Sequence, residues 1–162
     1  MNCGGLVRIR PMTPADVDRV VGIQSRLSQA PQWPQDAYQA MLYPHSAPER
    51  IALIAEIAET GSIAGFSVVR LMPPEAELEA IAVAAEFQRR GVARQLVRAL
   101  ADRVRRAQVR EILLEVRASN EPAKALYRSI GFTDEGRRGS YYADPVEDAV
   151  LMRLRIPSPQ PE

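Results

Sequence analysis

Alternating apolar and polar positions predict strands through much of the first half of the chain. In residues 6–10, Val7 and Ile9 alternate with Arg8 and Arg10, which is typical of a strand with one buried face. Three apolar runs predict further strands over 51–58, 62–72 and 76–83. The connection between the first two of these runs is short enough for a hairpin, so we expect the N-terminal part of the sheet to be antiparallel.

Apolar residues at helical spacing predict four helices. Thr13 can cap the first, which continues to about residue 27, and a shorter helix follows over 36–43. The third, over 91–107, has one apolar face and an arginine-rich outer face. Asn120 is a suitable cap for the fourth helix, and Gly131 ends it.

The remaining segments complete a mixed α/β fold. A strand over 111–118 follows the third helix, which predicts a right-handed parallel crossover. Two final strands are predicted over 132–142 and 149–156, and the polar residues 143–148 form the loop between them. We therefore expect one domain over 1–156, with about four helices around a mixed sheet of about seven strands, antiparallel in its N-terminal part. Residues 157–162 hold three prolines and predict a disordered tail.

Composition narrows the classes of function. The 21 basic and 20 acidic side chains leave a net charge of +1, without the basic excess typical of nucleic-acid binding. Cys3 is the only cysteine, which excludes an internal disulfide and favours a reducing, cytoplasmic compartment. With His45 as the only histidine, the usual ligands of a zinc site are missing. No apolar run reaches the roughly 18–20 residues that span a bilayer, and no signal peptide is recognisable, so we expect no membrane partner.

The stretch from Gln88 to Arg94 carries the clearest chemistry. It joins a predicted strand to a predicted helix, and the first amides of a helix have no partners inside it. Together with the helix dipole they attract anions, Gly91 leaves room for a phosphate, and three arginines add positive charge. The stretch predicts a cradle for a phosphorylated cofactor; a basic helix start without a ligand fits these seven residues equally well.

Two predicted strand ends place further residues near this cradle. Open α/β sheets bind ligands at the carboxyl ends of their strands. The strands that end at Val83 and near Arg117 are predicted parallel neighbours that lead into different helices. We therefore expect this parallel pair to splay apart and open a crevice for the ligand.

These segments also resemble a known family. Gln-Arg-Arg-Gly-Val-Ala at 88–93 resembles the acetyl-CoA signature of the GNAT N-acetyltransferase superfamily, Gln/Arg-x-x-Gly-x-Gly/Ala. More specific segments are similar to the RimI branch, the ribosomal-protein alanine N-acetyltransferases. They are Leu-Glu-Val-Arg-Ala-Ser-Asn at 114–120, Ala-Leu-Tyr at 125–127, Gly-Phe at 131–132, Tyr-Tyr at 141–142 and Glu-Asp-Ala at 147–149. The likeness is close over 78–154 and holds only in outline over the N-terminal third.

The resemblance implies a role for each matching residue. The backbone of Ile81, Ala82 and Val83 pairs with the pantetheine arm of acetyl-CoA, and the Val83 N–H stabilises charge on the thioester oxygen. Glu115 is implied as the general base, and Tyr127 as the general acid, which also contacts the cofactor. Further cofactor contacts are implied for Asn120 and for the amides of Arg89, Arg90, Gly91, Val92, Ala93 and Arg94.

Each catalytic assignment has an alternative. Glu115 shares a strand face with Arg117, so a plain ion pair between them is possible. Tyr127 shares its helix face with apolar residues, which fits core packing of the ring. Glu77 and Glu79, on the strand before the cradle, are rival carboxylates for the role of base.

The acceptor side is less well specified. Trp33 lies between two prolines and fits core packing better than a substrate groove. Tyr141 and Tyr142, with the loop that follows them, could form a wall of the acceptor site, but they fit an exposed hairpin equally well.

The residues and the resemblance together predict an enzyme. It moves acetyl from acetyl-CoA directly to the N-terminal α-amine of a protein, with no metal and no acyl-enzyme. The RimI branch implies an N-terminal alanine of a small-subunit ribosomal protein as acceptor. From the balanced charge we expect no nucleic-acid partner, and we expect a monomer or weak dimer. Two alternatives stay open: acetylation of a small-molecule amine or a lysine side chain, and an acetyl-CoA-binding sensor without catalysis.

Overall fold

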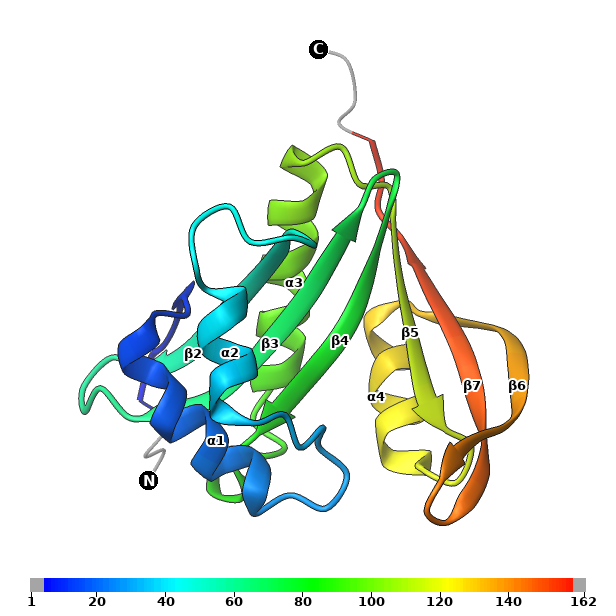
Figure 1. The fold of residues 1–162 in the computed structure, drawn as a ribbon, viewed down its shortest axis with the longest axis horizontal. Helices are drawn as coiled ribbons and strands as arrows, with labels where there is room; N and C mark the ends of the chain where they lie inside the picture. The colour runs from blue at the N-terminus through cyan, green and yellow to red at the C-terminus, as the bar shows by residue number, and fades with distance from the viewer. Residues whose placement is uncertain (1–4, 159–162) are drawn as a thin grey trace. The chain divides into compact units, whose positions relative to one another are not determined.

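A seven-stranded mixed sheet with four α-helices makes up residues 5–158, the part of the chain that this computed structural model describes (Figure 1). Cys3 and the last four residues of the predicted tail lie outside that part. The strands are β1 (Val7–Pro11), β2 (Arg50–Ile57), β3 (Ile63–Met72), β4 (Glu75–Val83), β5 (Glu111–Arg117), β6 (Thr133–Ala143) and β7 (Val146–Arg155). The helices are α1 (Val17–Ser25), α2 (Gln35–Met41), α3 (Val92–Arg106) and α4 (Glu121–Ile130), with 3₁₀ turns η1 (Pro14–Asp16) and η2 (Ala85–Phe87).

The sheet has the strand order β1-β2-β3-β4-β5-β7-β6. β4 and β5 pair in parallel, whereas β1–β2, β2–β3, β5–β7 and β6–β7 pair antiparallel. The predicted mixed α/β class, strand number and helix number are therefore confirmed. The chain divides into two compact units, Met1–Leu71 with Leu78–Asp102, and Met72–Glu77 with Arg103–Glu162. The single domain over 1–156 stays a prediction.

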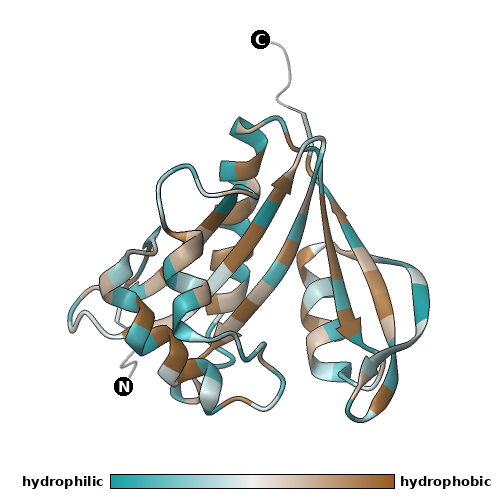
Figure 2. Ribbon diagram, viewed as in Figure 1, coloured by the Kyte–Doolittle hydropathy of each residue, from teal (hydrophilic) through white to brown (hydrophobic). Residues whose placement is uncertain are grey.

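The first unit is built around one side of β2 and β3, which α1 and α2 cover (Figure 1). Buried residues alternate along β4, whereas the residues of β3 are buried without interruption from Ile63 to Val69. Figure 2 shows the apolar positions of these strands in brown. Tyr38 is fully buried, packs edge-on against Phe66 at 6.0 Å between ring centroids, and donates its hydroxyl to Gln24 Oε1 at 2.6 Å. Trp33 lies 5.6 Å from the Tyr38 ring and packs against the same core, which supports the core interpretation of this tryptophan.

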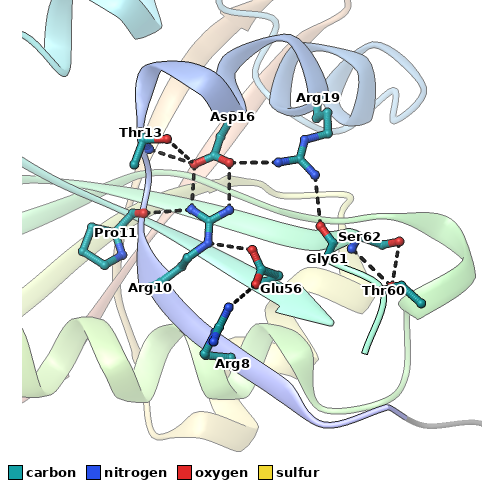
Figure 3. A network of polar contacts seen from close by, with 10 residues as sticks. All are labelled: Arg8, Arg10, Pro11, Thr13, Asp16, Arg19, Glu56, Thr60, Gly61 and Ser62. Carbon is teal, nitrogen blue, oxygen red and sulfur yellow. Dashed lines mark hydrogen bonds and ion pairs between the residues drawn. The ribbon is translucent and has the colours of Figure 1, made fainter. Parts of the chain in front are cut away.

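A charged network ties α1 to the sheet (Figure 3). Arg10 on β1 donates through Nη1 and Nη2 to the two oxygens of Asp16, at 2.7 and 2.8 Å. The same guanidinium donates through Nε to Glu56 on β2 at 2.8 Å. Asp16 also accepts from the backbone N–H of Thr13 at 2.8 Å, so one buried carboxylate closes the turn that begins the helix.

The second unit is a β5–β7–β6 sheet with α4. Buried residues alternate along β5, and β7 pairs with it from Glu111 opposite Arg155 to Arg117 opposite Ala149. The loop predicted over 143–148 is wrong in its second half. Val146 already pairs with Ala143, because a tight turn at Asp144 and Pro145 needs no further residues. The acidic side chains of this stretch interrupt the hydrophobic pattern, so the pattern did not predict where the strand starts.

Candidate active site

The cradle stretch has the backbone geometry of a strand-to-helix loop in the first unit. Arg89 and Gly91 have positive φ values of 61° and 79°. Gln95 N–H donates to the Gly91 carbonyl at 3.0 Å, and α3 begins at Val92. The amides of the first helical turn therefore have no acceptor within the helix. A Cβ placed on Gly91 would meet no atom within 4 Å, so Gly91 serves the left-handed backbone conformation and leaves open space beside it.

The end of β4 leads directly into this loop. Ala80 and Ala82 are buried, whereas Ile81 and Val83 are half-buried on the other face. Gln88 Nε2 donates to the Val83 carbonyl at 3.0 Å, so the first residue of the cradle is tied back to the strand. The three residues implied to pair with a pantetheine arm therefore keep a defined position relative to the loop.

Glu115 lies in the second unit, on the half-buried face of β5. Its Oε1 lies 3.2 Å from Arg138 Nε, and the carboxylate also acts on the Tyr141 hydroxyl, whose pKa it raises. Glu115 therefore pairs with Arg138, and not with Arg117 as the alternative had it. Arg117 instead pairs with Glu147 at 3.4 Å and lies 4.2 Å from the centre of the Tyr142 ring.

Helix α4 presents the predicted acid. Asn120 Oδ1 accepts from the Ala123 N–H at 3.2 Å, which confirms the predicted cap, and Gly131 ends the helix with φ of 122°. Tyr127 packs edge-on against Phe132 at 5.6 Å. Burial, with a smaller contribution from Tyr142, raises the pKa of Tyr127 to about 12. The phenol therefore keeps its proton at neutral pH, as a proton donor must.

The two hairpin tyrosines lie in the second unit, as Glu115 does. Tyr141 is about half exposed, and its ring lies 5.1 Å from that of Tyr142 in an edge-on arrangement. The hydrogen bond to Glu115 raises the pKa of Tyr141, as do partial burial and the charge of Glu115. Thus the second unit brings Glu115, Tyr141 and Tyr142 into one cluster, which the alternative of an isolated exposed hairpin did not anticipate.

A rival carboxylate in the first unit is already engaged. Glu79 on β4 accepts from Arg50 Nε at 2.7 Å, and Arg70 Nε lies 3.8 Å from its other oxygen. A cavity of about 510 Å³ also lies in this unit, lined by α1, the β2–β3 turn and η2. Neither Glu79 nor any residue of the cradle lines this cavity, so we do not assign the proton transfers to it.

Sequence reasoning missed Arg138 as a partner of Glu115. The two residues are 23 positions apart and lie on strands separated by β7, so no local spacing connects them. The hint available was Gly139 and Ser140 directly after Arg138, because a glycine inside a strand is a signal for a bulge.

Comparison with known proteins defines the class. The model of the "Acetyltransferase (GNAT) family" matches residues 20–132. The [ribosomal protein bS18]-alanine N-acetyltransferase of Escherichia coli is 40% identical over 103 residues, 62% of this chain and 70% of that protein. The N-alpha-acetyltransferase RimI of Mycobacterium tuberculosis is 36% identical over 150 residues, 91% of each chain. The crystal structure of the E. coli ribosomal-protein-S18-alanine N-acetyltransferase has a TM-score of 0.79, with 30% identity and 97% of both chains covered.

The fold and the cradle thus define an acyltransferase scaffold. The chain belongs to the GNAT acetyltransferase family. Members of this fold solved with acetyl-CoA include Arabidopsis thaliana NAA60, with a TM-score of 0.81 at 17% identity, which shows the fold alone.

Proposed function

We propose that this protein transfers acetyl from acetyl-CoA to the N-terminal α-amine of a protein, with an N-terminal alanine of a small-subunit ribosomal protein as the acceptor. The observation that carries the proposal is the likeness to the E. coli bS18-alanine N-acetyltransferase along 97% of both chains. The matching of Glu115, Asn120 and Tyr127 to the motif residues supports it. Among residues 5–158, no helix is long and apolar enough to cross a membrane.

The acceptor type follows from proton chemistry. The attacking nitrogen must be neutral, and an α-amine has a pKa of about 7.7–8.0 against about 10.4 for lysine. Deprotonating the α-amine at neutral pH therefore costs roughly 3.5 kcal/mol less. A carboxylate base therefore suits an α-amine better than a lysine side chain.

The proposed steps use groups of this chain. The nitrogen attacks the thioester carbonyl, the new C–N bond forms, and Glu115 accepts the ammonium proton directly or through one water. The Val83 N–H stabilises the negative charge on the carbonyl oxygen. The C–S bond then breaks, and Tyr127 donates its proton to the sulfur. Backbone amides of the cradle hold the pyrophosphate of the donor.

A mass-spectrometric assay tests the proposal. The protein is incubated with acetyl-CoA and a peptide that begins with alanine and contains one internal lysine. We expect one acetyl group on the α-amine, and no product from the same peptide with a blocked N-terminus. Acetylation of the lysine alone would exclude the proposed acceptor, and acetyl-CoA binding without turnover on any amine would favour the sensor alternative.

Gly65 on β3 allows a test of the β4 backbone that we assign to the donor. A Cβ on Gly65 would lie 2.6 Å from the Ala82 carbonyl oxygen and 3.3 Å from the Val83 Cα, both backbone atoms. We expect Gly65→Ala to displace this backbone, to lower the free energy of unfolding by about 1–3 kcal/mol and to weaken acetyl-CoA binding. Denaturant unfolding and calorimetric titration with acetyl-CoA measure the two effects.

Gly22→Ala is the matched control for this substitution. A Cβ on Gly22, within α1, would meet no atom within 4 Å. Because glycine is unfavourable inside a helix, this substitution should raise the free energy of unfolding by up to about 1 kcal/mol. The variant should bind acetyl-CoA like the wild type. Unchanged acetyl-CoA affinity in a folded Gly65→Ala protein would remove the β4 backbone from the proposed donor site.

A further inference from the structure

The carboxylate of Glu115 is held by two side chains of β6. Arg138 Nε approaches its Oε1 to 3.2 Å, and the same carboxylate acts on the Tyr141 hydroxyl, whose pKa it raises. The Arg138 guanidinium also lies 5.6 Å from the centre of the Tyr141 ring, within the range of a cation–π contact. The two partners of Glu115 therefore support each other as well as the carboxylate.

Sheet register explains how an arginine of β6 reaches a glutamate of β5. β7 lies between them, and Leu151 of β7 is opposite both Glu115 and Gly136. Gly136 has no side chain to fill the place across from Glu115. Arg138, two residues further along β6, is on the same face and is long enough to cover that place diagonally.

A bulge in β6 brings the second partner to the same carboxylate. Residues 138 and 141 are three apart, so in a regular strand their side chains would point to opposite faces. The register shifts between Arg138 and Tyr142, and Ser140 has a positive φ of 50°. This irregularity reverses the alternation and lets Arg138 and Tyr141 approach Glu115 together.

Asp148 holds the bulge in place. Its Oδ1 accepts from the Ser140 N–H at 2.9 Å, and its Oδ2 lies 3.6 Å from Arg137 Nη1. Arg137 and Arg138 thus have separate tasks although they are neighbours and are similarly exposed, at 61% and 58% of their side-chain surface. Arg137 contacts the residue that holds the bulge, and Arg138 contacts the carboxylate.

We infer that Arg138 is a positioning residue that fixes the orientation of the Glu115 carboxylate, together with Tyr141, which the bulge that Asp148 holds brings to the same place. The inference rests on the proposed function, in which Glu115 accepts the proton of the acceptor amine. Proton transfer requires the accepting oxygen within hydrogen-bond reach of the amine or of one intervening water. Arg138 occupies Oε1, so the carboxylate presents a defined second oxygen instead of rotating freely.

The test is a double-mutant cycle with a matched control. Arg138→Met, Arg138→Lys and Arg137→Met are assayed in the wild-type and Glu115→Gln backgrounds, on a peptide with N-terminal alanine. We expect Arg138→Met to lower kcat about tenfold with an unchanged KM for acetyl-CoA, because misplacement of a catalytic group costs rate. Arg138→Lys should recover part of this loss, and Arg137→Met should keep a kcat within about twofold of wild type. In the Glu115→Gln background, Arg138→Met should cause no further loss.

The other outcomes separate the inference from the function on which it rests. Equal kcat values for Arg138→Met and Arg137→Met, with Glu115→Gln inactive, would overturn the positioning role and leave the proposed base intact. The same tenfold loss in both backgrounds would show that Arg138 acts independently of Glu115, for example on the acceptor, and would also overturn it. Wild-type kcat in Glu115→Gln alone would remove the base itself, and the inference with it.

Discussion

Glu115→Gln should lower kcat by about 10²–10⁴-fold, the range that a positioned general base contributes. Glutamine keeps the shape of the side chain and an oxygen that Arg138 can contact, but it cannot accept a proton. The KM for acetyl-CoA should stay within about twofold of wild type, since the cradle at 88–94 is untouched. Initial rates at saturating acetyl-CoA, on a peptide with N-terminal alanine, measure the effect, and a thermal melt checks that the variant is folded.

Glu79→Gln is the control for this prediction. Glu79 is a half-buried glutamate like Glu115, with 13% of its side chain exposed against 17%, and each pairs with an arginine. It was the rival base by sequence. We expect a kcat near wild type for Glu79→Gln; if this variant is inactive and Glu115→Gln is not, the base lies on β4.

Local patterns predicted most of the fold. The alternation of Leu78, Ala80 and Ala82 identified the buried face of β4, because side chains along a strand alternate in direction whatever lies around it. Asn120 and Gly131 identified the ends of α4, because caps satisfy backbone groups within a few residues. The same locality made the cradle stretch recognisable, since loop, glycine and helix start are consecutive in the chain.

Contacts between distant segments were not predictable in this way. The sequence offered Arg117, two residues along the same strand, as an alternative ion-pair partner of Glu115, yet Arg138 comes from β6 across an intervening strand. Register through β7 decides that contact, and the bulge at Gly139–Ser140 adds Tyr141 to it, because a bulge changes side-chain direction without changing the hydrophobic pattern. Asp16 is a similar case: it lies three residues after Thr13, the predicted cap, but its main partner, Arg10, lies on the preceding strand.

Asp16 makes a buried ion pair with Arg10 that contributes to stability. Its side chain is 2% exposed and accepts two hydrogen bonds from the Arg10 guanidinium (Figure 3). The hydrogen bonds from Arg10 are the largest cause that lowers the pKa of Asp16 from 3.8 to about 2, and the Thr13 N–H adds to them. A folded-state pKa below the unfolded value means that the interaction stabilises the protein above pH 4 and is lost as the pH falls through 2.

We expect Asp16→Asn to lower the free energy of unfolding by about 2.5 kcal/mol at pH 7, the equivalent of this pKa difference. Asparagine keeps the size of the side chain and an acceptor for the Thr13 N–H, but it leaves Arg10 without its second carboxylate beside Glu56.

Urea unfolding at pH 7 and pH 3 measures the effect. The difference between variant and wild type should shrink to about half at pH 3, because the Asp16 carboxylate of the unfolded chain, with its ordinary pKa of 3.8, is largely protonated there while the folded one is still ionised. Asp36→Asn, at an exposed position in the first turn of α2, should change stability by less than about 0.5 kcal/mol. A loss of equal size at both pH values would show that packing around Asp16, and not its charge, holds the start of α1 to the sheet.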